Sequence, residues 1–178
     1  VTLIGSTPGQ LPTQVAYLPQ HPVSSHTLPL CVQDVVAMGR FAHLGLFKRS
    51  TDADRAIVLE SMKRTGIDSQ ANDPIRDLSG GQQQRTHLAQ VLARRAEVLL
   101  LDEPTAGLDL NGRKAVADLI ATERARGVTV VLATHELADA ESANLVMLLA
   151  QRVVSLGAPA QALRDEYLRE CFGFTQPH

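Results

Sequence analysis

The sequence has no tryptophan, only two tyrosines, and only two cysteines, Cys31 and Cys171. Two thiols this far apart do not make the framework of a disulfide-rich fold, and we expect both to be reduced. No apolar run approaches the roughly 18 residues that span a bilayer, and no basic start followed by an apolar run indicates a secretory signal. The net charge of −2 excludes the strongly basic surface typical of nucleic-acid-binding proteins. These absences favour a globular cytoplasmic protein without a nucleic-acid partner.

The first part of the chain predicts one strand and a helical lobe. Prolines and glycines occur throughout the first 30 residues and indicate turns. Between them, Val15–Leu18 is a candidate for a short strand. A helix is predicted over 32–43 from its apolar face. A second helix begins at Thr51, which has a carboxylate at the capping-box position three residues on, and it ends near Gly66. Residues 32–76 should therefore form a helical lobe.

After Asp77 the pattern changes to helices and strands in alternation. The run Val98–Leu101 is apolar without polar alternation, which is typical of a parallel strand buried on both faces. A helix that ends near Gly127 follows, and Val128–Ala133 is a second apolar strand. Strand, helix and strand in this order form a βαβ unit, so the fold class should be α/β with a parallel sheet. Further along, the sequence predicts a short helix over 136–143 and two strands over 145–149 and 152–156, close enough for a hairpin. A C-terminal helix is predicted from 160 onward.

Acidic and imidazole side chains follow directly after the two apolar strands. Asp102 and Glu103 come at the end of the first strand, and His135 follows the second. Ligands of open α/β sheets bind beyond the carboxyl ends of the strands. An aspartate there can hold Mg2+ against phosphates, and an adjacent glutamate can orient and deprotonate an attacking water. The alternative is that the two carboxylates only cap the next turn.

A second candidate site lies where a helix begins after Ser79. Ser79 is followed by Gly80 and Gly81. The free backbone N–H groups and the dipole of a helix N-terminus attract phosphate, and glycine lets the phosphate come close. The alternative is an ordinary capped helix with a flexible approach.

Taken together, these features resemble the motif set of ABC transporter ATPases. Leu78–Arg85 is similar to their signature motif, Val98–Glu103 to the Walker B strand, and Ala106–Asp109 to the D-loop. Upstream, Tyr17–Gln20 resembles the Q-loop, and His135 has the position of the switch histidine. The resemblance implies an α/β fold with the P-loop NTPase-like parallel sheet core of the ABC ATPase type and an α-helical subdomain.

The resemblance also implies how the chain is divided. Residues 1–178 would be part of one ABC ATPase domain. The α-helical subdomain would cover 32–76. The signature helix and the core with Walker B and the switch histidine would cover 77–158, and a C-terminal helix and tail would cover 159–178.

The resemblance assigns a role in ATP hydrolysis to each residue at the sheet edge. Glu103 would be the general base, and His135 would contact the γ-phosphate and the attacking water. Asp102 would hold Mg2+. Gln20 would approach Mg2+ and report to the membrane partner.

The signature and D-loop residues would act across a dimer. Ser79 and Gly81, with their neighbours Gly80 and Gln82, would bind the γ-phosphate of ATP on the opposite subunit. This role implies a head-to-tail homodimer of ATPase subunits with two shared sites. Asp109 would link the two sites.

One family motif is missing from the chain. No Gly-x-x-x-x-Gly-Lys-[Ser/Thr] loop is present, and Gly5–Gly9 lacks its lysine and its spacing. In the family this loop lies upstream of the Q-loop, so it would precede Val1, where the sequence reads as a strand already in progress. We therefore expect a truncated chain that binds ATP weakly alone and hydrolyses almost none. The alternative is a degenerate relative that no longer binds ATP. Loss of the loop's strand and helix should also expose apolar surface on the sheet.

The type of transporter is indicated only by resemblance. The segments Asp34–Arg40 and His43–Leu46 resemble the corresponding segments in ATPases of importers for metal ions and for iron-siderophore, haem or cobalamin complexes. The segment Gln82–Arg85 favours the manganese/zinc type. Import would require an integral membrane permease and, indirectly, an extracytoplasmic substrate-binding protein. The ATPase would then lie at the cytoplasmic face of the cell membrane as a peripheral subunit. A soluble ABC protein of translation or repair and a non-hydrolysing binding module are the rival classes. His43 and His87 are interpreted as surface or partner-facing residues.

Overall fold

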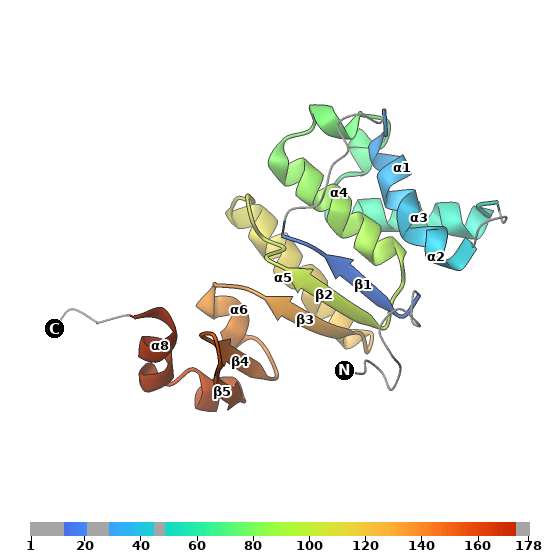
Figure 1. Ribbon diagram of the computed structural model, residues 1–178. Helices are drawn as coiled ribbons and strands as arrows, with labels where there is room; N and C mark the ends of the chain where they lie inside the picture. Colours follow the sequence, from blue (N-terminus) through green and yellow to red (C-terminus); the bar gives the residue numbers. More distant parts are fainter. Residues whose placement is uncertain (1–12, 21–28, 45–48, 174–178) are drawn as a thin grey trace. The chain divides into compact units, whose positions relative to one another are not determined.

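The computed structural model describes residues 13–20, 29–44 and 49–173, and the chain divides into two compact units, residues 1–133 and 134–178 (Figure 1). The expected opening strand and the glycine-rich stretch Gly5–Gly9 lie outside the described residues. No helix among the described residues is both long enough and apolar enough to cross a membrane.

A parallel sheet of three strands forms the centre of the first unit. The strands lie in the order β1 (Val15–Leu18), β2 (Val98–Asp102) and β3 (Thr129–Ala133). Helix α5 (Leu110–Ala125) connects β2 to β3, and α4 (Gly80–Ala93) precedes β2. This arrangement confirms the predicted α/β class and the βαβ unit.

One face of the sheet packs against both long helices. The side chains on this face come from alternate positions of each strand, as the two-residue period of a strand requires. They form one core with the apolar stripes of α4 and α5, and this core comprises Ala16, Leu18, Leu88, Val91, Leu92, Ala96, Leu99, Leu101, Leu108, Val116 and Leu119. Both long helices therefore cover the same face of the sheet.

The opposite face of the sheet carries an apolar row that stays accessible to solvent. Tyr17, Leu100 and Val131 are register partners across the three strands. Tyr17 is 57% exposed and Val131 is 54% exposed, while Leu100 is half-buried. The prediction that Val98–Leu101 is buried on both faces thus holds for its other three residues and not fully for Leu100.

The helical lobe consists of several short elements and one long helix. The predicted helix over 32–43 is broken into three pieces, because the chain tightens into a 3-10 turn in its middle. Gly39 lies in this turn, and a Cβ there would stand 2.2 Å from the carbonyl oxygen of Gln90 in α4. The elements of the lobe are α1 (Val32–Ala37), η1 (Met38–Arg40), α2 (Phe41–Leu44), α3 (Asp52–Thr65), η2 (Asp68–Gln70) and η3 (Ile75–Asp77).

The ends of α3 match their sequence signals. Thr51 Oγ1 accepts from the N–H of Asp54 at 3.2 Å, and the N–H of Thr51 donates to Asp54 Oδ2 at 3.0 Å, which completes the capping box. Gly66 follows the last turn with a left-handed φ of 66°. Both predicted boundaries are confirmed.

Helix α4 belongs to two cores at once. Ala89 and Ala93 pack with Val32, Val36, Met62 and Ile67 of the lobe, whereas Leu88 and Leu92 pack on the sheet. Figure 1 shows α4 lying between the lobe helices and β1. His87 of this helix is buried, so its interpretation as a surface residue is wrong, and burial lowers the pKa of its imidazole.

The second unit is a hairpin with short helices. Strands β4 (Val146–Leu149) and β5 (Val153–Gly157) pair antiparallel, as predicted, and pack through Val146 and Leu148 against the helices of the same unit. These helices are α6 (Leu137–Glu141), α7 (Pro159–Ala162) and α8 (Asp165–Phe172).

Candidate functional site

The turn after β2 places Glu103 in a constrained backbone conformation. Glu103 has φ of +46°, which a residue with a Cβ rarely adopts and which costs about 1–3 kcal/mol. Its N–H donates to the carbonyl of Ala133 at the end of β3 at 2.9 Å, and its own carbonyl accepts from Ala106 N–H at 3.0 Å. The backbone is thus held from both sides, which fixes the direction in which the carboxylate leaves the sheet.

The structure brings Gln20 and Glu103 together. Gln20 follows β1, and because β1 and β2 are parallel neighbours, their carboxyl ends meet at one edge of the sheet. Gln20 Nε2 donates to Glu103 Oε2 at 2.9 Å across 83 residues of sequence. Two of the predicted catalytic residues therefore share a direct contact.

Asp102 is the last residue of β2, beside the Glu103 turn. Among the described residues its carboxylate has neither an ion-pair partner nor a side-chain hydrogen bond, so its oxygens can accept a cation. No group of three or more acidic, histidine or cysteine side chains in the described chain could hold a metal ion by itself. Proteins commonly bind Mg2+ through one or two carboxylates together with substrate phosphates.

Ser79 begins α4 as a complete capping box. Ser79 Oγ accepts from the N–H of Gln82 at 3.3 Å, and Gln82 Oε1 accepts from the N–H of Ser79 at 2.9 Å. The side chain of Gln82 therefore serves the cap. The first backbone N–H groups of a helix have no hydrogen-bond partner within the helix. In α4, the N–H groups of Gly80 and Gly81 can therefore bind an anion.

The first turns of α4 lie against the turn that carries Glu103. A Cβ on Gly81 would be 3.4 Å from Leu108 Cδ2, and Gln84 Nε2 donates to the carbonyl of Pro104 at 3.1 Å. In the same turn, Asp109 caps α5 by accepting from Gly112 N–H at 2.8 Å. The signature, Walker B and D-loop residues are thus neighbours in the first unit.

His135 lies in the second unit. Its Nε2 is 3.8 Å from Glu136 Oε1, and its side chain is exposed. Nearby, Thr134 Oγ1 donates to Asp139 Oδ2 at 2.8 Å and accepts from the N–H of Glu136 at 3.1 Å. The role of His135 beside Glu103 stays a prediction.

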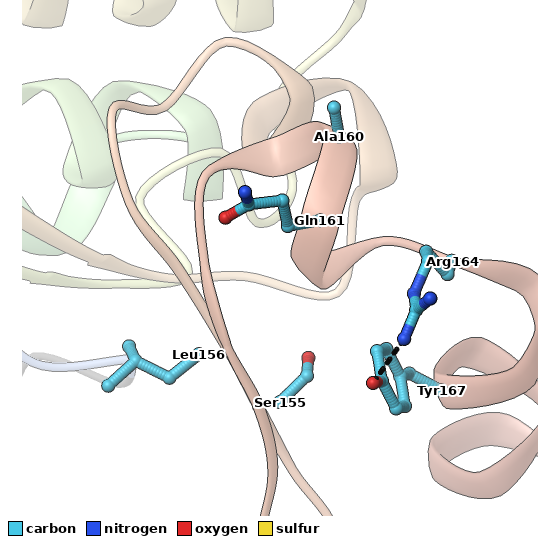
Figure 2. Close-up of a pocket in the computed structure, with 6 residues that line it drawn as sticks. All are labelled: Ser155, Leu156, Ala160, Gln161, Arg164 and Tyr167. Carbon is cyan, nitrogen blue, oxygen red and sulfur yellow. Dashed lines mark hydrogen bonds between the residues drawn. The ribbon is translucent and has the colours of Figure 1, made fainter.

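The second unit also contains a shallow pocket of about 350 Å³ (Figure 2). Arg164 and Tyr167 face each other at its rim, with the guanidinium 4.7 Å from the ring centroid. Glu166 forms an ion pair with Arg164 at 2.6 Å, so the charge of this rim is already balanced. None of the residues predicted for catalysis or nucleotide binding lines this pocket.

Sequence reasoning missed the contact of Gln84 with the Pro104 carbonyl. The residue stood inside the recognised motif, but nothing marked it out from its neighbours Gln82 and Gln83. The available signal was weak: Gln84 precedes Leu88 by four residues, so the two lie on the same face of the helix.

Comparison of the chain with known proteins shows its family. The family model for ABC transporters matches residues 5–106, which is more than half of the chain. The chain belongs to the ABC transporter family of ATP-binding proteins.

Relatives of the chain in this family include metal transport proteins. It is 36% identical over 160 residues to the manganese transport system ATP-binding protein MntB of Halalkalibacterium halodurans, covering 89% of this chain and 64% of the relative. It is 35% identical to the zinc transport system ATP-binding protein TroB of Treponema pallidum, covering 90% and 60%. A solved metal-chelate type ABC transporter in an inward-facing conformation matches with 29% identity and a TM-score of 0.80, over 90% of this chain and 64% of that chain. The chain therefore spans less than two thirds of the length of these relatives.

Proposed function

We propose that this ABC ATPase chain belongs to a protein that binds and hydrolyses ATP to power the import of a metal ion of the manganese or zinc type. The observation that carries the proposal is the contact of Gln20 with Glu103 beside Asp102, at the carboxyl edge of a parallel sheet. The manganese and zinc transport proteins among the relatives support the choice of cargo.

In the proposed reaction, Glu103 accepts a proton from the water that attacks the γ-phosphate. The hydrogen bond from Gln20 orients the carboxylate, and the strained backbone keeps it at the sheet edge. Asp102 would hold Mg2+, which neutralises charge on the phosphates when bound. His135 would contact the γ-phosphate.

The signature residues act on a second copy of the subunit in this proposal. Ser79, Gly80 and Gly81 would bind the γ-phosphate held by the opposite protomer in a head-to-tail homodimer, with Gln82 completing the cap and Asp109 joining the two sites. The support is the capped helix start with two glycines, set against the Glu103 turn.

The proposed place of the protein is the cytoplasmic face of the cell membrane, bound to an integral permease and served indirectly by an extracytoplasmic substrate-binding protein. Within the chain we assign 32–76 to the α-helical subdomain, 77–158 to the core and 159–178 to the C-terminal helix and tail. The lobe helices and Gln20 are the proposed contact with the permease.

A second candidate cargo is a metal chelate such as an iron-siderophore complex. It is favoured by one observation, the likeness to the solved metal-chelate type transporter. An uptake assay distinguishes the two candidate cargoes. Vesicles that hold the whole transporter are tested for uptake of radioactive manganese or zinc and for uptake of an iron-siderophore complex.

The experiment that tests the ATPase proposal compares this chain with a form extended upstream through its gene. We expect the extended form to hydrolyse ATP and the chain alone to show almost no turnover, because the phosphate-binding loop is not in it. Equal turnover of the two forms would contradict this expectation. An inert extended form would favour a non-hydrolysing binding module.

A further inference from the structure

A buried amide contacts the main chain beside the proposed general base. Gln84 is only 7% exposed, although it follows the exposed start of α4. Its Nε2 donates to the carbonyl oxygen of Pro104 at 3.1 Å. A buried polar side chain needs partners, and a buried carbonyl needs a donor, so each group satisfies the other.

The carbonyl that Gln84 contacts belongs to the strained turn. Pro104 follows Glu103 directly and is fully buried. The peptide groups on either side are held by main-chain bonds, from Glu103 N–H to Ala133 and from Ala106 N–H to Glu103. Gln84 adds a side-chain bond to this turn from a different element, α4.

The three successive glutamines of α4 contact three different partners. Gln82 caps the helix, and Gln83 Nε2 donates to the carbonyls of Ile75 and Leu78 at 3.2 and 3.1 Å, in the segment before the helix. Gln84 alone of the three reaches the Glu103 turn. The contact is therefore specific to one position, and Gln83 offers a matched control.

We infer that Gln84 is a positioning residue for Glu103, which holds the left-handed turn so that the carboxylate stays in place for the attacking water. The inference rests on the proposed function of Glu103 as general base. A backbone conformation that is unfavourable by itself persists only where its surroundings determine it. Loss of the Gln84 bond should therefore loosen the turn without removing any group that touches ATP.

The test uses two variants of similar size that remove the amide donor. Gln84→Met removes the polar group, and Gln84→Glu keeps the shape but replaces the amide by a carboxylate. Hydrogen exchange of single amides, followed by NMR on the chain itself, reports the turn without any need for activity. We expect both variants to lower the protection of the Ala106 amide about five- to tenfold. The amide of Leu100 in β2 should keep its protection and shows that the variants fold. Gln83→Met should leave Ala106 unchanged.

Steady-state hydrolysis by the extended protein provides the second measurement. We expect the kcat of both Gln84 variants to fall about tenfold to a hundredfold while KM stays the same, because the misplaced group acts on water and not on ATP binding. Unchanged protection of Ala106 in both variants would overturn the inference, as would lowered protection with unchanged kcat. If protection falls but the unsubstituted extended protein hydrolyses no ATP, the structural bond of Gln84 stands and the proposed role of Glu103 fails.

Discussion

At the scale of single residues, the proposed hydrolysis depends on Glu103, whose backbone and carboxylate are both held by other elements. The N–H of Glu103 is fixed by the end of β3, and its carboxylate accepts from Gln20. Because the two anchors come from neighbouring strands on either side of β2, the geometry of the sheet sets the position of the carboxylate.

Glu103→Gln should abolish hydrolysis by the extended protein. The amide cannot accept the proton of the attacking water, so we expect turnover to fall by about 10²- to 10⁴-fold. ATP binding should persist, and size-exclusion chromatography with ATP should show a stable dimer. Turnover equal to that of the unsubstituted protein would exclude Glu103 as the general base.

The buried imidazole of His87 should make stability depend on pH. Burial lowers the pKa of His87 from its ordinary value of 6.5, against a smaller opposing effect of the Gln90 hydrogen bond. The folded protein therefore keeps the ring neutral where the unfolded chain already binds a proton, and stability should fall as the pH drops below about 6.5. Urea midpoints at pH 7.5 and 5.5 should differ less for His87→Gln than for the unsubstituted chain.

His43→Gln is the control for this effect. His43 is exposed, and its Nε2 lies 2.7 Å from the carbonyl oxygen of Arg94. We expect His87→Gln to reduce the pH dependence more than His43→Gln does, because of these two histidines only His87 is buried. An unaltered pH dependence in His87→Gln would show that another group causes the acid sensitivity.

At the scale of elements, the close contact of the lobe with α4 depends on a residue without a side chain. A Cβ on Gly39 would lie 2.2 Å from the Gln90 carbonyl oxygen and 3.1 Å from Ala93 Cβ. Gly39→Ala should therefore push the helices apart and destabilise the chain by about 1–3 kcal/mol. Chemical denaturation measures the loss. Gly157→Ala is the matched control, since its Cβ would meet only the flexible side chain of Gln161, and an equal loss in both variants would contradict the packing explanation.

The elements themselves were largely predictable from local sequence. The strand Val15–Leu18, the capped helix after Thr51 and the late hairpin follow from signals within a few residues of each element. The break at Gly39 was not predictable, because its cause is a contact with α4 about 50 residues away. The exposure of Val131 in β3 could not be predicted for a different reason. Val130, Val131 and Leu132 are all apolar, so no alternation of apolar and polar residues indicates which of them faces solvent.

The sequence named the candidate residues of the site but not the contacts between them. The order of motifs named Gln20, Glu103 and Ser79, since each motif is a local pattern. The bond between Gln20 and Glu103 depends on which strands become neighbours, and the bond from Gln84 depends on the direction in which a helix turns. Neither hydrogen bond can be predicted from the spacing of residues in the sequence.

At the scale of the whole molecule, the apolar row of Tyr17, Leu100 and Val131 should contribute to self-association. Exposed apolar surface of this kind favours self-association. We expect the chain to form concentration-dependent oligomers in light scattering and to bind a hydrophobic dye. Val131→Thr should reduce both effects in the chain. Dye binding by Val131→Thr equal to that of the unsubstituted chain would contradict the role of this row.

The parallel pairing of β1 with β2 also has a consequence for the order of events during synthesis. Val15 pairs with Val98, so β1 must wait until about 80 more residues have left the ribosome. At about 5–20 residues per second this is a delay of roughly 4–16 seconds. During that interval β1 cannot form its pairing with β2, whereas the lobe elements from α1 to η3 have already been synthesised. The edge of β1 that later pairs with β2 is therefore open to chaperones until β2 emerges.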